Sequence, residues 1–276
     1  MARLAFRTAL LGGAAAMSAA LAAAPAAQAV PVTFAQFTEA QTGTSSGAPQ
    51  NLVFTRAADG RSGRLNTADT KAGDNVFFSF LGYDNLPEGL LGQQRAHLKI
   101  NGGAGVTTTA RVVSSASPGT GTLLSQPFNG EFTLAFTRDT PFVPTFGLLA
   151  GRGLTNLLTV TLGPLDGVSP VLSGYTGTKA LAGTFDKDLV KLTFSSDFLD
   201  FSNVQDRNAA VSFSAVVNSL LQQGNFLRSF RADATGTFAA DPAPLLLVGL
   251  PVPEPASVAL LGAGLLGLVL VRRRAA

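Results

Sequence analysis

The 276-residue chain contains no cysteine, no tryptophan and a single histidine, His97. Without cysteine it can form no disulfide, no thiolate metal site and no cysteine nucleophile, and one histidine is too few for the usual zinc sites. Charged residues make up 13% of the chain, against about 25% in an average domain, so the surface must be largely uncharged. Glycine (30) and proline (15) indicate many turns, but fewer than the roughly 25–30% Gly and Pro of low-complexity chains.

The N-terminal 29 residues have the three parts of a secretory signal peptide. The positive region, the apolar run and the small residues that signal peptidase reads are, in order, Arg3 with Arg7, Ala9–Ala24, and Ala27 with Ala29. We therefore expect cleavage after Ala29. An uncleaved anchor is the alternative, but the apolar run is shorter than the roughly 20 residues that span a bilayer.

The C-terminus carries an uncharged apolar segment between a proline-rich motif and a basic cluster. These three parts are Pro253, Glu254 and Pro255; Ser257 to Val271; and Arg272, Arg273 and Arg274. A helix over residues 256–271 would be about 24 Å long, slightly short of a hydrocarbon core of about 30 Å, so snorkelling arginines would complete the span. The basic cluster predicts that this end stays cytoplasmic and that the body lies on the other side.

This tail resembles the PEP-CTERM protein-sorting signal of Gram-negative bacteria, and the resemblance is confined to the end of the chain. It implies that a membrane enzyme, an exosortase, recognises Pro253, Glu254 and Pro255 and removes the tail after export. The apolar helix and the arginines would hold the chain in the inner membrane until then, after which it reaches the cell surface or the medium. The alternative is an ordinary C-terminal anchor with a chance Pro-Glu-Pro.

The charge of the body differs from that of the whole chain. Five of the 20 basic residues and one of the 17 acidic residues lie in the two ends, which leaves 15 basic and 16 acidic residues between them. Nucleic-acid binding requires a basic patch on the folded body, and no such cluster occurs. We therefore expect no nucleic-acid partner.

The body shows the period-two alternation of half-buried β-strands. Alternating stretches lie at 96–101, 106–112, 130–138, 158–162, 190–195 and 211–215; further strand candidates are 32–37, 52–56, 226–231 and 234–239. The stretch 75–81 is nearly all apolar and predicts a central strand covered on both faces. Asn101-Gly102-Gly103, Asn129-Gly130 and Asp166-Gly167 are typical turn sequences, and the first predicts a hairpin between the strands on either side of it.

The predicted fold is all-β: an antiparallel β-sandwich or jelly-roll-like body between a signal helix and a single C-terminal transmembrane helix. We expect a signal peptide at 1–29, the body at 30–236, an Ala/Pro/Leu-rich stalk at 237–252 and the sorting tail at 253–276. Two stretches are ambiguous: 216–222 could form a short helix, and 84–94 a helical turn.

Candidate catalytic and metal-binding residues are few. His97 in its alternating strand is interpreted as a solvent-face residue, because no Gly-x-Ser-x-Gly elbow accompanies it. Asp186, Asp188, Asp197 and Asp200 flank one strand and are weak calcium candidates, but the spacing lacks the Asp-x-Asp-x-Asp-Gly loop. They are interpreted as solvated turn residues. We expect no cofactor and no catalytic residue.

The leading hypothesis is an exported, non-catalytic protein with a structural or adhesive role in the extracellular matrix. A glycan- or calcium-binding module, with exopolysaccharide as a partner, is the first alternative, and a secreted hydrolase is the second. Lysines on edge strands discourage pairing with other chains, and the body has only five lysines. We therefore also expect the cleaved form to self-associate.

Overall fold

The computed structural model describes residues 31–40, 52–58, 62–83, 86–102, 111–113, 121–145, 149–217, 219–224 and 226–245. By its contacts the chain divides into Met1–Val30 and Pro31–Ala276, and all described residues belong to the second unit. In this part of the chain every paired strand is antiparallel, and no α-helix occurs. The predicted antiparallel all-β class is confirmed.

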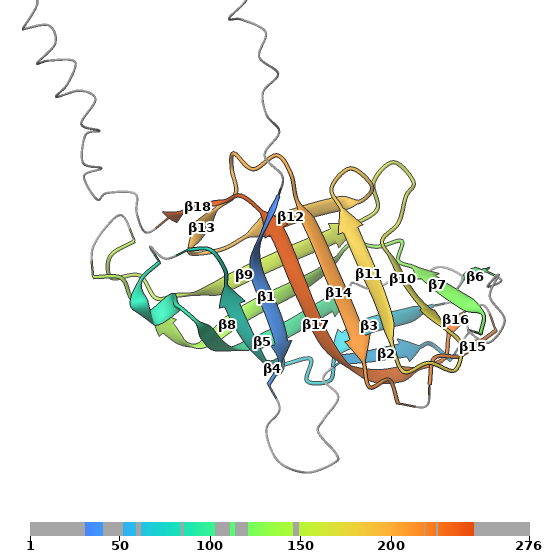
Figure 1. Cartoon of the computed structure of the whole chain (residues 1–276). Coiled ribbons are helices and arrows are strands. Elements are labelled where there is room, and N and C mark those ends of the chain that lie inside the picture. Colours follow the sequence, from blue (N-terminus) through green and yellow to red (C-terminus); the bar gives the residue numbers. More distant parts are fainter. Residues whose placement is uncertain are drawn as a thin grey trace, which may run out of the picture. The chain divides into compact units, whose positions relative to one another are not determined.

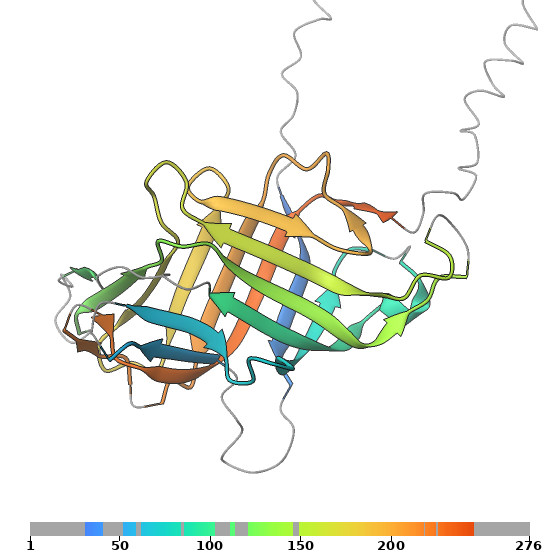
Figure 2. The ribbon, with the colours of Figure 1, turned by 180° about the vertical axis from the view of Figure 1, so that it is seen from behind.

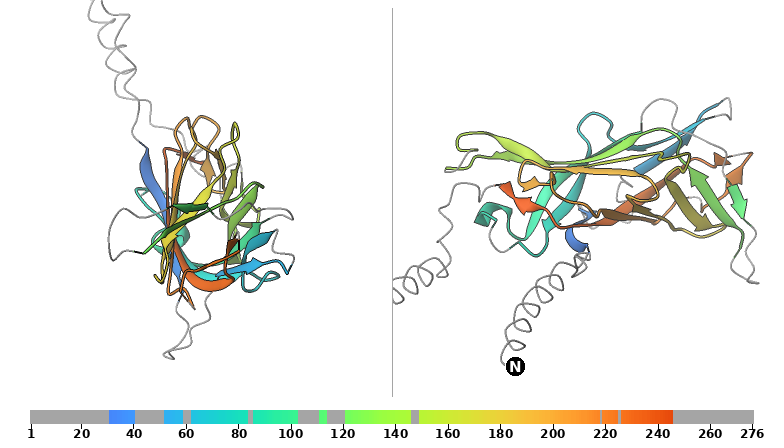
Figure 3. Two further views of the ribbon diagram at one scale, coloured as in Figure 1. Left: turned by 90° about the vertical axis from the view of Figure 1, so that its right-hand side faces the viewer. Right: turned by 90° about the horizontal axis from the view of Figure 1, so that it is seen from above.

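Within the described ranges, fourteen strands form one hydrogen-bonded sheet that folds into two layers (Figures 1 and 2). The first layer contains, in order, β12 (Lys191–Ser195), β9 (Leu154–Gly163), β8 (Phe132–Phe142) and β5 (Gln93–Gly102). The second contains β17 (Phe230–Ala240), β14 (Asn208–Ser214), β11 (Leu181–Asp186), β10 (Val171–Tyr175), β7 (Leu123–Pro127) and β6 (Arg111–Val113). Figure 3 shows the layers edge on.

Two strand pairs connect β5 to β17, so the layers belong to one folded sheet and are not two separate sheets. The pairs are β4 (Asp74–Phe80) with β1 (Val32–Glu39), and β3 (Gly63–Thr67) with β2 (Leu52–Arg56). β1 pairs with the C-terminal half of β17, and β2 pairs with its first residues. Along β17, the pairing with β2 ends at Ala232 and the pairing with β1 begins at Gly236. We call this place the seam.

Smaller elements lie outside the main sheet. They are the pair β13 (Leu199–Asp200) and β18 (Ala243–Pro244), the pair β15 (Gln222–Gln223) and β16 (Phe226–Leu227), and the 3-10 turn η1 (Glu88–Leu90). The helical turn expected within 84–94 is therefore present. No helix forms over the described part of 216–222, where the chain turns into β15 instead.

Phenylalanines from both layers fill the core. The rings of Phe136 on β8 and Phe238 on β17 lie 5.7 Å apart between centroids, and Phe37 on β1 lies 4.8 Å from Phe136. A hollow of about 10 Å³ between the layers, lined by apolar residues that include Ile100 and Phe213, is far below the roughly 300–1,000 Å³ of ligand pockets. The interior at this place serves packing alone.

Alternation located β5, β8, β9, β12 and β14, whereas β3, β7, β10 and β11 were not predicted. β4 was predicted but departs from its prediction. Val76, Phe78 and Phe80 are buried, whereas Asn75 is exposed and Phe77 and Ser79 are half-buried. β4 therefore has one covered face, and the apolar run was misleading because Phe77 lies on the outer side. The hairpin predicted at Asn101 falls partly outside the described residues, and β6 pairs with β7. Asp166 and Gly167, both with positive φ, form the predicted turn.

The boundary predicted between body and stalk at 236/237 is wrong. β17 continues to Ala240 and pairs with β1 and β14 over these residues, and Phe238 has no exposed surface. β18 and the described body then extend to Leu245, whose N–H donates to the Phe198 carbonyl. The alanine-rich composition suggested a stalk, but Ala240 is itself buried in the core.

Candidate functional site

The outer face of β4, β5 and β8 brings together the polar side chains of one candidate site. His97 on β5 lies opposite Asn75 on β4 and Thr137 on β8. Its Nε2 lies 2.7 Å from Oδ1 of Asp139. Because a carboxylate can only accept, Nε2 must carry the proton. The His97 side chain is 32% exposed and that of Asp139 is 49% exposed, so the pair lies at the surface.

The second ring nitrogen of His97 has no hydrogen bond in the described structure. Nδ1 is buried without a partner there, and a Cβ added at Gly73, in the turn before β4, would lie 3.4 Å from the His97 Cβ. A serine-type hydrolase needs a nucleophile on the ring nitrogen that the carboxylate does not hold. The structure thus pairs a histidine with an acid, which the sequence did not indicate, and among the described residues no hydroxyl is hydrogen-bonded to Nδ1.

A small hollow adjoins this pair. Its volume is about 80 Å³, and its lining includes Asn75 and Phe77 from β4, Arg95 from β5, and Asp139. Phe77 lies opposite Arg95 on one side and Thr38 on the other. An aromatic ring, a cation and an anion therefore share one part of the outer face, which we call the Phe77 hollow.

The seam holds a cluster of acidic residues. Burial, together with the hydrogen bond and the charge of Asp233 and the charge of Asp74, raises the pKa of Glu39 to about 8. Burial also raises the pKa of Asp74, although its carboxylate accepts from the N–H groups of Ala68 and Asp69. Glu39 is therefore mostly protonated at neutral pH. This cluster was not predicted from the sequence, because its members are far apart along the chain.

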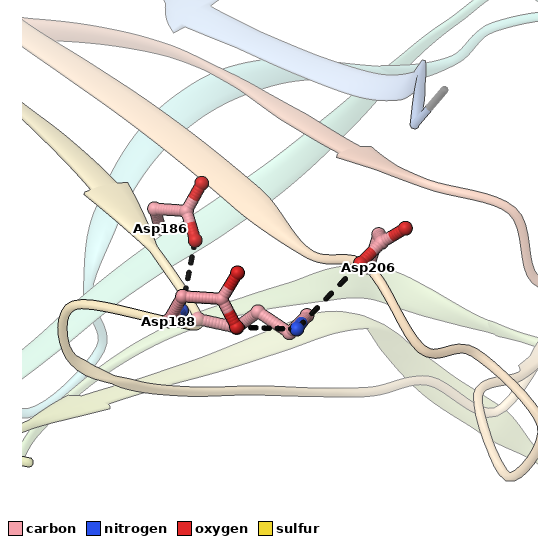
Figure 4. Close-up of polar contacts among 4 residues, drawn as sticks. Asp186, Asp188 and Asp206 are labelled. Atoms are coloured by element: carbon pink, nitrogen blue, oxygen red, sulfur yellow. Dashed lines mark hydrogen bonds and ion pairs between the residues drawn. The ribbon is translucent and has the colours of Figure 1, made fainter. Parts of the chain in front are cut away.

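The four predicted calcium candidates do not assemble into a metal site. Lys187 lies among the acids, with Nζ 2.5 Å from Asp188 and 3.6 Å from Asp206. Figure 4 shows Asp186, Asp188 and Asp206 with the polar contacts of this group as dashed lines. The hydrogen bond to Asp188 raises the pKa of Lys187. Asp186 accepts from the Asp188 N–H. Lysine already supplies the positive charge at this place.

The other two candidates accept hydrogen bonds from backbone N–H groups of the protein itself. Asp197 accepts from the N–H groups of Thr155 and Asn156 at 2.9 and 2.8 Å, and Asp200 accepts from the Ser202 N–H at 2.8 Å, which lowers the pKa of Asp200. No group of three potential ligands suited to a metal ion occurs among the residues that the structure describes. The interpretation of these residues as turn residues fits their contacts.

The predicted processing residues all lie outside the described residues. They are Ala27 and Ala29, the motif Pro253, Glu254 and Pro255, the segment Ser257–Val271, and Arg272, Arg273 and Arg274. In the described ranges no helix has the length and apolar character needed to cross a bilayer. The described body ends at Leu245, beside an open groove of about 370 Å³ that Phe194, Leu199 and Phe201 help to line.

Comparison with known families identifies the tail. Residues 251–274 match the PEP-CTERM protein-sorting motif, as the resemblance predicted. This motif implies an exported, cell-envelope-targeted protein that an exosortase recognises. No curated protein and no solved structure matches the chain significantly.

Proposed function

We propose that this protein is an exported surface or extracellular-matrix component whose β body has a non-catalytic, structural or adhesive role. Exosortase removes the tail after the chain has been held briefly in the inner membrane. The match at 251–274 supports the route, and the character of the outer sheet faces supports the role.

Rows of uncharged polar side chains cross both outer faces. On the first layer Thr193, Thr161, Thr133 and Asn101 lie opposite one another on four successive strands. A second row runs from the second layer onto β1 and β4. It contains Thr184, Thr237, Gln36 and Ser79 and is interrupted by Ala210. Hydroxyl and amide groups both donate and accept hydrogen bonds. Such a surface can adhere to hydroxyl-rich or amide-rich material without depending on charge.

The same architecture supports self-association. β12 ends the strand order of the main sheet and pairs with β9 alone among the described strands. An edge strand presents unpaired backbone groups to another chain. Its one lysine, Lys191, lies 2.8 Å from Glu131, so the charge that would discourage edge pairing is partly neutralised. Sedimentation should show oligomers at high concentration, and a strictly monomeric profile would contradict this.

The role is tested in cells that lack the gene. We expect loss of surface adhesion or of retained matrix, and restoration by the full chain. A chain with Thr133, Thr161 and Thr193 replaced by alanine should restore less than one with serine at all three positions. Alanine and serine both have lower β-propensity than threonine, but serine keeps the hydroxyl. Unchanged adhesion and matrix after deletion would refute the role.

A further inference from the structure

The Phe77 hollow has features that packing of the body does not require. Burying a phenylalanine contributes about 1.5–3 kcal/mol, and Phe78 and Phe80 on the same strand are buried. Phe77 instead lies half-buried on the outer face, in a row with Thr38 and Arg95. Single exposed apolar residues are ordinary, but this one lines a hollow together with a cation and an anion.

The charges of the hollow indicate a neutral ligand. Arg95 is exposed and offers N–H donors, whereas Asp139 offers acceptor oxygens. One positive and one negative side chain cancel, so neither an anion nor a cation is favoured overall. A sugar hydroxyl both donates and accepts and can satisfy both groups. His97 holds one oxygen of Asp139 at 2.7 Å and is therefore a positioning residue.

The aromatic ring suits the apolar face of a sugar. The face of an aromatic ring carries partial negative charge, and the C–H groups on one face of a pyranose carry partial positive charge. A pyranose above Phe77 could direct its hydroxyls toward Arg95 and Asp139. The ring, donor and acceptor thus supply the three kinds of contact that a neutral sugar offers.

The size of the hollow indicates a polymer. About 80 Å³ is well below the roughly 300–1,000 Å³ of small-molecule pockets, so the hollow can receive one edge of a sugar ring. The rest of a longer chain would lie on the outer face, where Thr137 and Asn75 flank His97 in one cross-strand row. A free monosaccharide would bury too little surface to bind well.

We propose that the Phe77 hollow binds a neutral polysaccharide, with one sugar edge in the hollow, its C–H face on Phe77 and its hydroxyls on Arg95 and Asp139. This inference rests on the proposed adhesive role, for which it names a ligand class.

The test is affinity electrophoresis of the full chain in a zwitterionic detergent without a sugar headgroup, because such a headgroup would compete. The probes are three neutral polymers, dextran, a soluble β-1,3-glucan and a galactomannan, with alginate as the charged comparator. We expect retardation by at least one neutral polymer. Phe77→Ala should weaken the affinity for that polymer about tenfold, and Arg95→Gln should weaken it about three- to tenfold.

Tyr175→Ala is the matched aromatic control, since Tyr175 is 39% exposed on β10 at a different part of the sheet. It should bind as the parent chain does, and circular dichroism should show that all variants fold. No retardation by any neutral polymer, retardation by alginate alone, or an unchanged affinity in both hollow variants would overturn the inference. Deletion cells without an adhesion defect would refute the proposed function instead, whatever the purified chain binds.

Discussion

Replacing Glu39 by glutamine tests the acidic cluster at the seam. Glu39 shares a hydrogen bond with Asp233, and its pKa is raised to about 8. Glutamine has the shape of the protonated acid and can also donate a hydrogen bond, but it cannot ionise. The substitution therefore keeps the contacts of the neutral form and removes its titration.

The sign follows from proton binding. Between pH 4.5, the ordinary value for Glu39, and about 8, the folded chain holds a proton that the unfolded chain has lost. Stability from this group is thus fully present below the lower value and is lost as the pH rises to the upper one. Each pH unit is worth about 1.4 kcal/mol at most. Because Glu39 is partly exposed, solvent screening reduces the total, and we expect a loss of about 1–2 kcal/mol.

The assay is thermal unfolding of the full chain in mild detergent at pH 5, 7 and 9. Glu39→Gln should match the parent at pH 5 and be more stable at pH 9, by about 2–4 °C for each kcal/mol. Glu88→Gln is the control, because Glu88 is exposed on η1. If the parent and Glu39→Gln differ equally at all three values, the cluster does not titrate as argued.

Three further predictions concern packing and ions. Phe238→Ala should cost about 3–5 kcal/mol in unfolding free energy, since its ring is buried; a change under 1 kcal/mol in urea titration would restore the stalk boundary. Gly236→Ala should cost about 1–3 kcal/mol, because a Cβ would lie 2.6 Å from the Phe37 ring; refolding yield and melting temperature should both fall. Calcium should not raise the melting temperature, because Lys187 already neutralises Asp188; a rise that EDTA reverses would contradict this.

The sequence was most informative for strands with one buried face and one solvent-facing face. In β8, Phe132, Leu134 and Phe136 are buried and alternate with half-buried residues, and alternation alone located this strand. It failed for β3, whose residues Gly63–Thr67 are mostly polar and glycine, because the backbone pairing with β2 and β5 decides that strand. Composition likewise misplaced the end of β17.

The candidate site depended on information that a single sequence does not contain. His97 was identifiable as a solvent-face residue, but Asp139 is 42 positions away and meets it because β5 pairs with β8 in one register. The same reasoning applies to Glu39 and Asp233, which lie on β1 and β17. The tail was the opposite case: its motif is contiguous, so the letters alone were sufficient.

The intact mass of the protein recovered from the cells that make it, together with the compartment in which it is found, tests the account most directly. We predict a product outside the inner membrane that begins at Val30 and lacks the hydrophobic segment and the arginines, with Glu254→Ala trapping a longer, membrane-bound form. A product that keeps Ser257–Val271, or a Glu254→Ala chain with the same mass and location as the parent, would contradict the account.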